Sequence, residues 1–323
     1  MIGRYHRPMA PPPRFPLFDD PSPLQPLPRF CERALDGRVE LWIKREDLLP
    51  VAFGGNKLRN LEYLVGSALA EGCDTLITSG RRWSNHARLT AAAGAMAGLA
   101  VHLVVSGPPV EPPGPGIRLA ALLGATVHQL PTADRGLREA TVISLVDDLQ
   151  AHGRRPYVIP TGGSGRIGAY GQVVAARELL DQAAAVRLGI DRVVLPSATG
   201  GTQAGLLVGL PAATKVTGIA VARPVDELRP AIAGMVAQLG GEIEAAAIEL
   251  DDRQLGEGYG KPSAAATAAA EELARSEGIL VDPIYTAKAL AGLVAGVRSG
   301  AWDGERIVFW HAGGLPGLFE PLD

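Results

Sequence analysis

Short apolar runs that alternate with helical stretches constrain the fold of this chain more than any other feature. The runs are Glu40 to Lys44, Thr75 to Thr78, Val101 to Val105, Thr126 to Leu130, Tyr157 to Ile159, Arg192 to Leu195, Val216 to Val221 and Arg306 to Trp310. Such strands, separated by Ala/Leu-rich helices, are typical of parallel sheets covered on both faces. The sequence therefore predicts an α/β fold, and its 323 residues fit two domains or one large α/β unit. Nine prolines in residues 8–28 predict an extended arm without regular strand pairing.

The composition argues against several classes of partner. A net charge of −3, without a dense run of Lys or Arg, argues against nucleic acid and membrane surfaces. Cys31 and Cys73 lack the spacing of a zinc site or a disulfide framework, so we expect no metal and a reducing cytoplasm. The N-terminus lacks the apolar run of a secretory signal, and glycines and a proline divide residues 89–110, so we expect no membrane span.

A lysine beside two glycines suggests covalent chemistry. In Gly54-Gly55-Asn56-Lys57, the glycines allow positive φ and close approach of the backbone to a ligand, and an apolar-periodic helix begins at the lysine. In a confined, partly desolvated site the pKa of a lysine falls, and its amine becomes a usable nucleophile. A Walker phosphate loop would need four residues between its glycines and a Ser or Thr after the lysine. Lys57 is therefore a candidate covalent catalyst, with an ordinary first-turn lysine as the alternative.

Two loops that follow apolar runs are candidate ligand sites, because ligands of doubly wound sheets collect at the carboxyl ends of the strands. After the second run, Ser84 and Asn85 precede a helix that starts near His86, and they fit either a helix cap or a ligand contact. After the sixth run, the small-residue loop from Pro196 to Gly205 leads into another helix. Its backbone amides and hydroxyls predict a phosphate cradle, and the absence of Lys and Arg from the loop favours a monophosphate over a triphosphate with metal.

A second glycine pattern offers a competing hypothesis. Gly163, Gly165 and Gly168 form G-x-G-x-x-G between a strand and a helix, so a dinucleotide site is a formal alternative. The acidic residue that would bind the ribose hydroxyls is missing at the end of the next strand, which runs into Leu195-Pro196-Ser197. This absence argues against a dinucleotide enzyme.

Taken together, nine segments resemble the fold-type II pyridoxal-phosphate enzymes and, within that group, the D-cysteine desulfhydrase and 1-aminocyclopropane-1-carboxylate deaminase family. In family order they are Pro21 to Leu24, Leu41 to Asp47, Gly54 to Arg59, Ser84 to Arg88, Gly162 to Ser164, Thr199 to Gly205, Gly258 to Gly260, Asp282 to Thr286 and His311 to Gly314. The resemblance implies the two-domain, three-layer fold of tryptophan synthase beta-like enzymes. It places residues 1–50 and 161–323 in a large cofactor-binding domain and residues 51–160 in a small domain with the Ser-Asn loop. It also implies pyridoxal 5'-phosphate as cofactor, a small amino acid as substrate and a homodimer.

The resemblance also implies roles for individual residues. Lys57 would bind the cofactor covalently and later carry the α-proton of the substrate, and the further catalytic groups would be Ser84, Tyr259 and Tyr285. The cofactor would contact Asn85 through its phenolic oxygen, Thr286 through its ring nitrogen, and Ser197, Ala198, Thr199, Gly200, Gly201 and Thr202 through its phosphate. The substrate would contact Trp83, Ser84, Asn85, His86, Gly163, Tyr259 and Tyr285, with ordinary packing as the alternative for the tyrosines.

Thr286 separates two reactions of this family. A carboxylate beside the pyridine nitrogen would keep the ring protonated and a strong electron sink, as the opening of a cyclopropane requires. A hydroxyl leaves a weaker sink, which suffices to remove an α-proton and expel a β-leaving group. Thr286 therefore favours elimination, with thiol, chloride, hydroxide or sulfite as the leaving group.

Some residues depart from the family pattern. Arg81, Arg82 and Trp83 stand where the family has a small, Gln-containing tract. An inward arginine could bind a second acidic group of the substrate, such as a sulfonate or carboxylate, and solvent-facing loop charges are the alternative. Other departures are Ala198 for glycine, Gly165 for asparagine and Ala312 for threonine, and the last two could remodel the substrate pocket.

The predicted activity is a pyridoxal-phosphate-dependent lyase reaction, an α,β-elimination that gives pyruvate, ammonia and the leaving group. The alternatives within the enzyme class are a 1-aminocyclopropane-1-carboxylate deaminase, an L-cysteate sulfo-lyase-like enzyme, an amino-acid racemase and a specialised biosynthetic enzyme. From another class, the chain could hold the cofactor without strong activity, if residues 81–83 and Ala312 fill the pocket.

Overall fold

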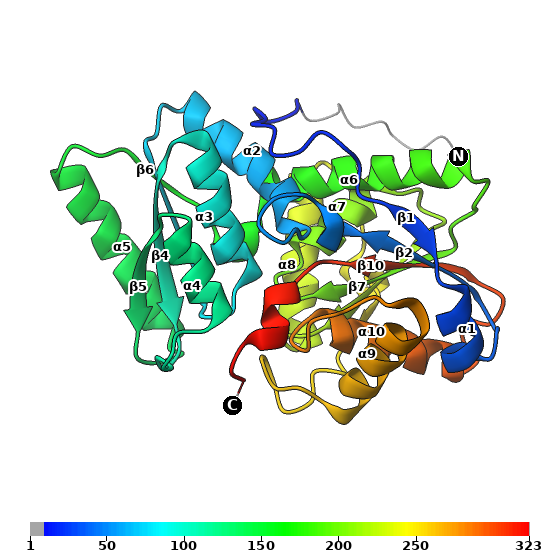
Figure 1. Cartoon of the computed structure of the whole chain (residues 1–323). Coiled ribbons are helices and arrows are strands. Elements are labelled where there is room, and N and C mark those ends of the chain that lie inside the picture. The colour runs from blue at the N-terminus through cyan, green and yellow to red at the C-terminus, as the bar shows by residue number, and fades with distance from the viewer. Residues whose placement is uncertain (1–9, 323) are drawn as a thin grey trace.

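The computed structural model describes residues 10–322 and contains two sheets, built from different parts of the chain (Figure 1). The first two residues of the proline-rich arm, and the N-terminal residues that argued against a secretory signal, lie outside the described residues. Within the described part, no helix combines the length and the apolar character that crossing a bilayer requires.

The elements alternate along the chain as the sequence predicted. The strands are β1 (Leu24–Pro26), β2 (Glu40–Arg45), β3 (Thr75–Arg81), β4 (Ala100–Ser106), β5 (Thr126–Leu130), β6 (Pro156–Val158), β7 (Arg192–Ser197), β8 (Lys215–Ala220), β9 (Leu250–Asp251) and β10 (Arg306–His311). The α-helices are α1 (Pro28–Leu35), α2 (Lys57–Ala70), α3 (Asn85–Ala97), α4 (Pro115–Leu122), α5 (Arg135–Ala151), α6 (Arg166–Ala185), α7 (Gly201–Gly209), α8 (Val225–Gln238), α9 (Ala264–Glu277) and α10 (Thr286–Arg298). Short 3-10 turns are η1 (Glu46–Leu48), η2 (Thr161–Gly163), η3 (Ala245–Ala247) and η4 (Leu315–Phe319). Each of the eight predicted strands begins within about one residue of its expected start.

Two edge strands were not predicted. β1 pairs antiparallel with β2 through Leu24 opposite Lys44 and Pro26 opposite Trp42, so the expectation of an unpaired arm was wrong at these residues. The prolines are tolerated because β1 is the outermost strand of its sheet, where no further strand needs the missing N–H group. β9, on the opposite edge, has only two residues and is too short to show periodicity.

The smaller sheet has the order β5-β4-β3-β6, and all its pairings are parallel. Helix α5 covers one face of this sheet, and α3 and α4 cover the other (Figure 1). Its core includes Leu76 of β3, Leu89 of α3 and Val101 of β4, together with Leu58 and Leu61 of α2. Helix α2 therefore begins near the larger sheet and packs its apolar stripe into the core of the smaller one.

The larger sheet has the order β1-β2-β10-β7-β8-β9 and is buried on both faces. Along β10, Ile307 and Phe309 pack with α1, α9 and α10, while Val308 and Trp310 pack with α6 and α7 on the other side. Since successive side chains of a strand point to opposite faces, burial on both faces requires an unbroken apolar run. This confirms the prediction of parallel-dominated sheets flanked by helices. The strands of the smaller sheet lie within residues 75–158, and the domain boundaries at residues 51 and 161 stay a prediction.

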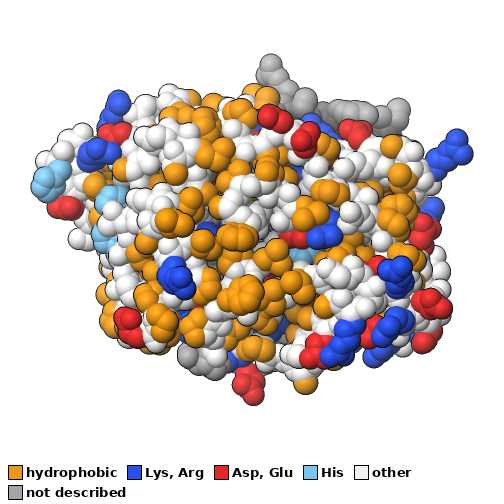
Figure 2. Space-filling view, viewed as in Figure 1, with side chains coloured by type: hydrophobic (Ala, Val, Ile, Leu, Met, Phe, Trp, Pro, Cys, Tyr) orange, Lys and Arg blue, Asp and Glu red, His pale blue; other side chains and the backbone are white. Residues whose placement is uncertain are grey.

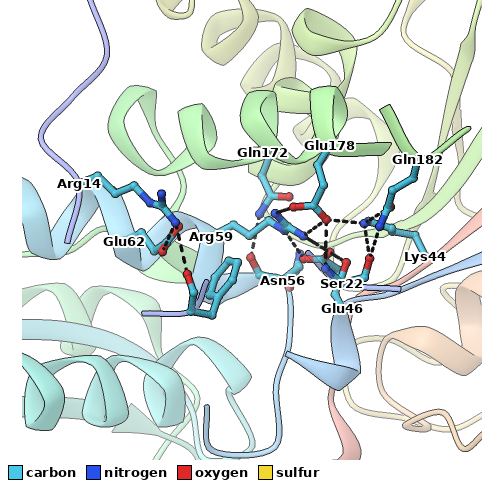
Figure 3. A network of polar contacts seen from close by, with 11 residues as sticks. Arg14, Ser22, Lys44, Glu46, Asn56, Arg59, Glu62, Gln172, Glu178 and Gln182 are labelled. Carbon is cyan, nitrogen blue, oxygen red and sulfur yellow. Dashed lines mark hydrogen bonds and ion pairs between the residues drawn. The ribbon is translucent and has the colours of Figure 1, made fainter. Parts of the chain in front are cut away.

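A buried ionic network joins α2 to the larger domain (Figure 3). Arg59 of α2 donates to Glu46 at 2.6 Å and to Glu178 of α6 at 2.8 Å. Burial alone would lower the pKa of Arg59, but these two carboxylates outweigh it and leave the pKa raised. Lys44 of β2 donates to the same Glu178 at 2.5 Å and to Gln182 at 2.6 Å. The start of α2 is therefore fixed against β2 and α6 by charge pairs as well as by apolar packing.

Candidate active site

A cavity of about 370 Å³ lies where loops from the two sheets meet, within the size range of small-molecule sites. The larger sheet contributes mainly the loop after β7, and the smaller sheet contributes the loop after β3, next to the start of α5. The predicted residues that line it are Lys57, Ser84, Asn85, His86, Ser197, Ala198, Thr199, Gly200, Gly201, Thr202, Tyr259 and Tyr285. No group of His, Cys, Asp or Glu side chains in residues 10–322 is arranged to hold a metal ion.

Lys57 is the lysine of this cavity. Three lysines have a lowered pKa, but Lys44 is held by Glu178 and Lys288 donates to the carbonyls of Leu255 and Gly258, at 2.8 and 2.9 Å. Desolvation lowers the pKa of Lys57 to about 8 from an ordinary 10.5. An amine with this pKa is partly neutral at neutral pH and can attack an aldehyde. The predicted environment of Lys57 is therefore present.

The glycine turn before Lys57 needs glycine for two reasons. Gly54 and Gly55 have φ of +61° and +126°, in the left-handed region that other residues avoid. A Cβ on Gly54 would lie 2.3 Å from the carbonyl oxygen of Asp47, and one on Gly55 would lie 3.2 Å from that of Ala312. The positive φ expected from the sequence is confirmed. The close contacts found here are with backbone carbonyls, and the expected close approach to a ligand stays a prediction.

Asn56 ties this turn to the larger domain. Its backbone N–H donates to the carbonyl of Ala312 at 3.0 Å, and its side-chain amide donates to the hydroxyl of Thr202 at 2.8 Å. Gln172 of α6 in turn donates to the Asn56 carbonyl at 2.8 Å. These bonds fix the position of the lysine turn relative to the loop after β7. The sequence alone did not predict them.

The loop after β7 has the features of a phosphate cradle. The first N–H groups of α7, from Gly201 onward, have no partner within the helix and carry the positive end of its dipole. Gly200 adopts φ +84°, and a Cβ there would meet Ile232 at 2.5 Å. The hydroxyl of Ser197 is buried without a hydrogen-bond partner among residues 10–322. An anion held at the start of α7 would supply the acceptor that these donors lack, so the loop fits a bound phosphate.

Ser84 and Asn85 combine the two roles that the sequence left open. Ser84 is the N-cap of α3, accepting from the Ala87 N–H at 3.2 Å, and it also lines the cavity. Asn85 accepts from Arg88 at its Oδ1 atom, at 3.3 Å, so its amide hydrogens remain for a ligand oxygen. Arg88, to which no role had been assigned, also donates to the carbonyls of Ala52 and of Gly54, and burial lowers its pKa to about 10. It links α3 to the lysine turn.

His86 is a neutral side chain with a defined tautomer. Its Nε2 atom lies 3.0 Å from the Thr78 hydroxyl, which donates its only hydrogen to the carbonyl of Ile159 at 2.9 Å. Nε2 must therefore carry the proton, and Nδ1 is a buried acceptor without a partner among the described residues. Desolvation and the charge of Lys57 lower the pKa of His86 to about 3. The ring atom Nδ1 can therefore accept a hydrogen bond from a ligand but cannot donate one, whereas the backbone N–H of His86, at the start of α3, is a donor; the predicted contact of His86 with the substrate stays a prediction.

The two predicted tyrosines meet in the cavity. The hydroxyls of Tyr259 and Tyr285 are hydrogen-bonded to each other. Burial raises the pKa of both, that of Tyr285 well above its usual range, so both are neutral phenols at neutral pH. When one hydroxyl donates to the other, the acceptor keeps its own hydrogen for a ligand.

Three predicted site residues lie behind the cavity surface. Trp83 is buried and packs edge-on against Tyr259, with ring centroids 5.7 Å apart. Gly163, with φ +63°, lies behind His86. Thr286 is buried, and its hydroxyl hydrogen has two acceptors, Asp282 at 2.7 Å and the carbonyl of Gly313 at 2.9 Å. Thr286 does not line the cavity itself, although its partner Gly313 does, and its contact with a ring nitrogen stays a prediction.

The G-x-G-x-x-G match has a packing explanation. A Cβ on Gly168 would lie 1.9 Å from the carbonyl oxygen of Gly163, so this glycine lets α6 pass close to the preceding turn. Gly165 has φ +135° and directly precedes α6. Gly163, Gly165 and Gly168 do not line the cavity among the described residues. Gly168 therefore serves helix packing, and Gly163 and Gly165 allow the positive φ of the preceding turn.

The two arginines of the unusual tract point to different places. Arg81 lines the cavity, whereas Arg82 is buried and donates to the carbonyl of Pro321 at 2.9 and 2.8 Å. Arg138 of α5, which sequence reasoning missed, lines the cavity near Arg81. Desolvation, followed by the charge of Arg135, lowers the pKa of Arg138. On the face shown in Figure 2, basic and acidic side chains are interspersed.

Comparisons with known proteins agree with this geometry. A family model described as pyridoxal-phosphate dependent enzyme matches residues 17–313. D-cysteine desulfhydrases of Salmonella choleraesuis (strain SC-B67) and Salmonella typhi are each 41% identical over 319 residues, which cover 95% of this chain and 95% of the relative. The crystal structure of an ACC deaminase homologue matches with a TM-score of 0.86 at 36% identity, covering 95% of this chain and 94% of that one.

The crystal structure of a threonine deaminase shares the fold alone, with a TM-score of 0.67 at 22% identity over 90% of this chain and 92% of that one. The fold is therefore the tryptophan synthase beta-like fold that the sequence predicted, and the cradle and Lys57 fit its cofactor. The chain belongs to the pyridoxal-phosphate-dependent enzymes of fold type II and, within them, to the D-cysteine desulfhydrase and ACC deaminase family.

Proposed function

We propose that this enzyme catalyses α,β-elimination from a small β-substituted amino acid, with D-cysteine as the reference substrate. The observation that carries the proposal is the amine of Lys57, which has a lowered pKa and shares one cavity with the cradle and the Tyr259–Tyr285 pair. Relatives that are 41% identical bear the name D-cysteine desulfhydrase, which supports this substrate class.

Bound pyridoxal phosphate supplies an electron sink that makes the Cα–H of the substrate acidic. The amine of Lys57 accepts this proton, because it is partly neutral at neutral pH. The bond between Cβ and the leaving group breaks, and the leaving group takes the electron pair. The released enamine tautomerises to an imine, and one water hydrolyses it to pyruvate and ammonia. For cysteine the leaving group is sulfide, which departs as hydrogen sulfide after taking up a proton.

Other residues of the cavity orient the substrate and move protons. The N-terminus of α3, capped by Ser84, offers unpaired N–H groups to the substrate carboxylate. Asn85, oriented by Arg88, can donate to an anionic oxygen of the cofactor. The free hydrogen of the tyrosine pair can be donated to the departing group.

Thr286 supports elimination over cyclopropane ring opening. A carboxylate does lie close by, since Asp282 accepts from the Thr286 hydroxyl. However, the oxygens of Asp282 also accept the N–H groups of Ile284, Tyr285 and Thr286, at 2.8 to 3.0 Å, so this carboxylate is engaged at the start of α10. The similarity to an ACC deaminase homologue keeps ring opening as the second candidate.

The test is a visible spectrum of the purified enzyme, followed by product analysis with each substrate. We expect an absorbance band of the bound cofactor that changes when D-cysteine is added, with release of pyruvate, ammonia and sulfide. The same assay with L-cysteine, β-chloroalanine, cysteate and 1-aminocyclopropane-1-carboxylate separates the alternatives, since only ring opening yields 2-oxobutanoate. If no small amino acid changes this band, the chain is instead a protein that holds the cofactor without strong activity. We also expect a homodimer on the basis of the family, and light scattering measures this.

A further inference from the structure

We propose that Arg81 and Arg138 form a second anion site in the cavity, so that the preferred substrate carries a sulfonate or carboxylate besides its α-carboxylate. The inference rests on the proposed function, because it defines the substrate class of the same elimination. It concerns positions at the end of β3 and the start of α5, on the small-domain side of the cavity.

The sheet brings the two arginines to one wall. Arg81 is the last residue of β3 and pairs in register with Ser106, the last residue of β4. Arg138 lies in the first turns of α5, and its Nη1 atom donates to the Ser106 hydroxyl at 3.2 Å. Both residues line the cavity. Ser106 thus anchors Arg138 beside the strand end that carries Arg81.

Both arginines have unused hydrogen-bond donors. The Nε atoms of Arg81 and Arg138 are buried without a hydrogen-bond partner among residues 10–322. Neither side chain forms an ion pair in this part of the chain, although charged side chains in such positions are usually paired. Glu227 is the only carboxylate among the described residues that line the cavity, and it is exposed on α8. A ligand with an acidic group would supply the missing acceptors.

Arg81 is held in place by aromatic rings. Its guanidinium carbon lies 5.0 Å from the centroid of the Trp83 ring, a distance at which a cation is attracted to an aromatic face. Trp83 is itself fixed by its edge-on contact with Tyr259. A planar guanidinium held in this way loses little freedom when it binds a sulfonate or carboxylate. The unusual tract at residues 81–83 therefore provides a positioned donor rather than a loose surface charge.

The other anions of the reaction have separate sites. The loop from Ser197 to Thr202 holds the phosphate on the larger domain, and the N-terminus of α3 offers donors to the α-carboxylate. The arginine pair is then left to bind an anionic group on the side chain of the substrate. With cysteate the Cα proton passes to Lys57, the Cβ–S bond breaks, sulfite leaves with the electron pair, and water hydrolyses the product to pyruvate and ammonia. Aspartate has no comparable leaving group, so it should bind as a competitive inhibitor.

The test compares charged and neutral ligands on the holoenzyme. Aspartate and its neutral counterpart asparagine, which lack a leaving group, are compared by binding calorimetry, and cysteate and its neutral counterpart serine, which the reaction consumes, are compared by their KM values. We expect Arg81→Gln and Arg138→Gln each to weaken the binding of the two acidic ligands by about 10- to 100-fold, because each variant loses a charge-assisted hydrogen bond. The binding of serine and asparagine should change by less than about 2-fold. The matched control is Arg118→Gln, which removes an exposed charge on α4. It should leave the binding of both the acidic and the neutral ligands unchanged.

Three results would overturn the second anion site. The first is a wild-type enzyme that binds acidic ligands no more tightly than their neutral counterparts. An equal loss for both classes in Arg81→Gln would mean that this arginine holds the α-carboxylate. A loss of cofactor affinity in either variant would assign the arginines to the phosphate. If instead binding is charge-selective but no ligand yields pyruvate or alters the visible band, the anion site stands and the proposed elimination fails.

Discussion

The pKa of Lys57 makes a quantitative prediction for cofactor capture. Desolvation lowers this pKa to about 8 from an ordinary 10.5. At pH 7.5, about a quarter of the apoprotein therefore carries the neutral amine, against about one molecule in a thousand for an ordinary lysine. Because only the neutral amine attacks an aldehyde, Lys57 should react about 200-fold faster at this pH than a surface lysine of equal intrinsic reactivity.

The assay is borohydride trapping of pyridoxal phosphate on the apoprotein, with the modified peptides quantified by mass spectrometry. Nα-acetyl-lysine added to the same reaction is the reference, since the titration of the reagent itself cancels in the ratio. The ratio of Lys57 to this model amine should be largest at neutral pH and fall as pH rises from about 8 to about 10.5, where the model amine also becomes neutral. His86 does not titrate in this range, because its pKa is lowered to about 3. A ratio that stays constant with pH would refute the argument.

Three further changes test the scaffold. Lys57→Met should stabilise the apoprotein by about 1–3 kcal/mol at neutral pH, because the folded state disfavours this charge, and the gain should vanish above about pH 10.5 in denaturant titrations. Gly54→Ala should lower both the melting temperature and cofactor binding, since its Cβ would lie 2.3 Å from a backbone oxygen, whereas Gly240→Ala, with φ +80° and open space, should cost only about 1 kcal/mol. Arg59→Met should cost about 3–5 kcal/mol because Glu46 loses its ion-pair partner and Glu178 loses one of two, while Arg14→Met, at a side chain 47% exposed, should cost less than about 1 kcal/mol. Equal losses of stability in Arg59→Met and Arg14→Met would contradict the argument that burial makes the Arg59 ion pairs stronger contributors.

The architecture was predictable where burial alone determines the sequence. The central residues of β7 and β10 are apolar because their side chains meet helices on both faces of the sheet, as Val193 and Val194 do on opposite faces. β1 was not predictable, since an edge strand has one hydrogen-bonding side free and its residues carry no period. Its assignment depends on the position of β2, which only the folded chain defines.

The candidate site was predictable where one short segment carries the chemistry. Gly54 to Lys57 indicated the turn, the helix start and the amine without knowledge of the rest of the chain. Arg138 was missed because its relation to Arg81 arises from the register of β3 and β4 and from the docking of α5. The tautomer of His86 could not be predicted either, since it depends on a hydrogen bond that Thr78 donates to the carbonyl of Ile159, the residue after β6. Protonation and charge pairing are tertiary properties, and sequence proximity does not encode them.

The position of the reactive amine results from three parts of the chain acting on one turn. The backbone carbonyl of Glu46 accepts from the Gly55 N–H at 2.8 Å, and that of Ala312, after the last strand, accepts from the Asn56 N–H. Arg88, from the small-domain helix α3, donates to the carbonyl of Gly54. A glycine-lysine turn alone would therefore leave the amine free to move, and the turn gains its fixed geometry only with its partners in place. This explains why the short motif is weak by itself and why the ordered set of segments, from β2 to the loop after β10, is diagnostic.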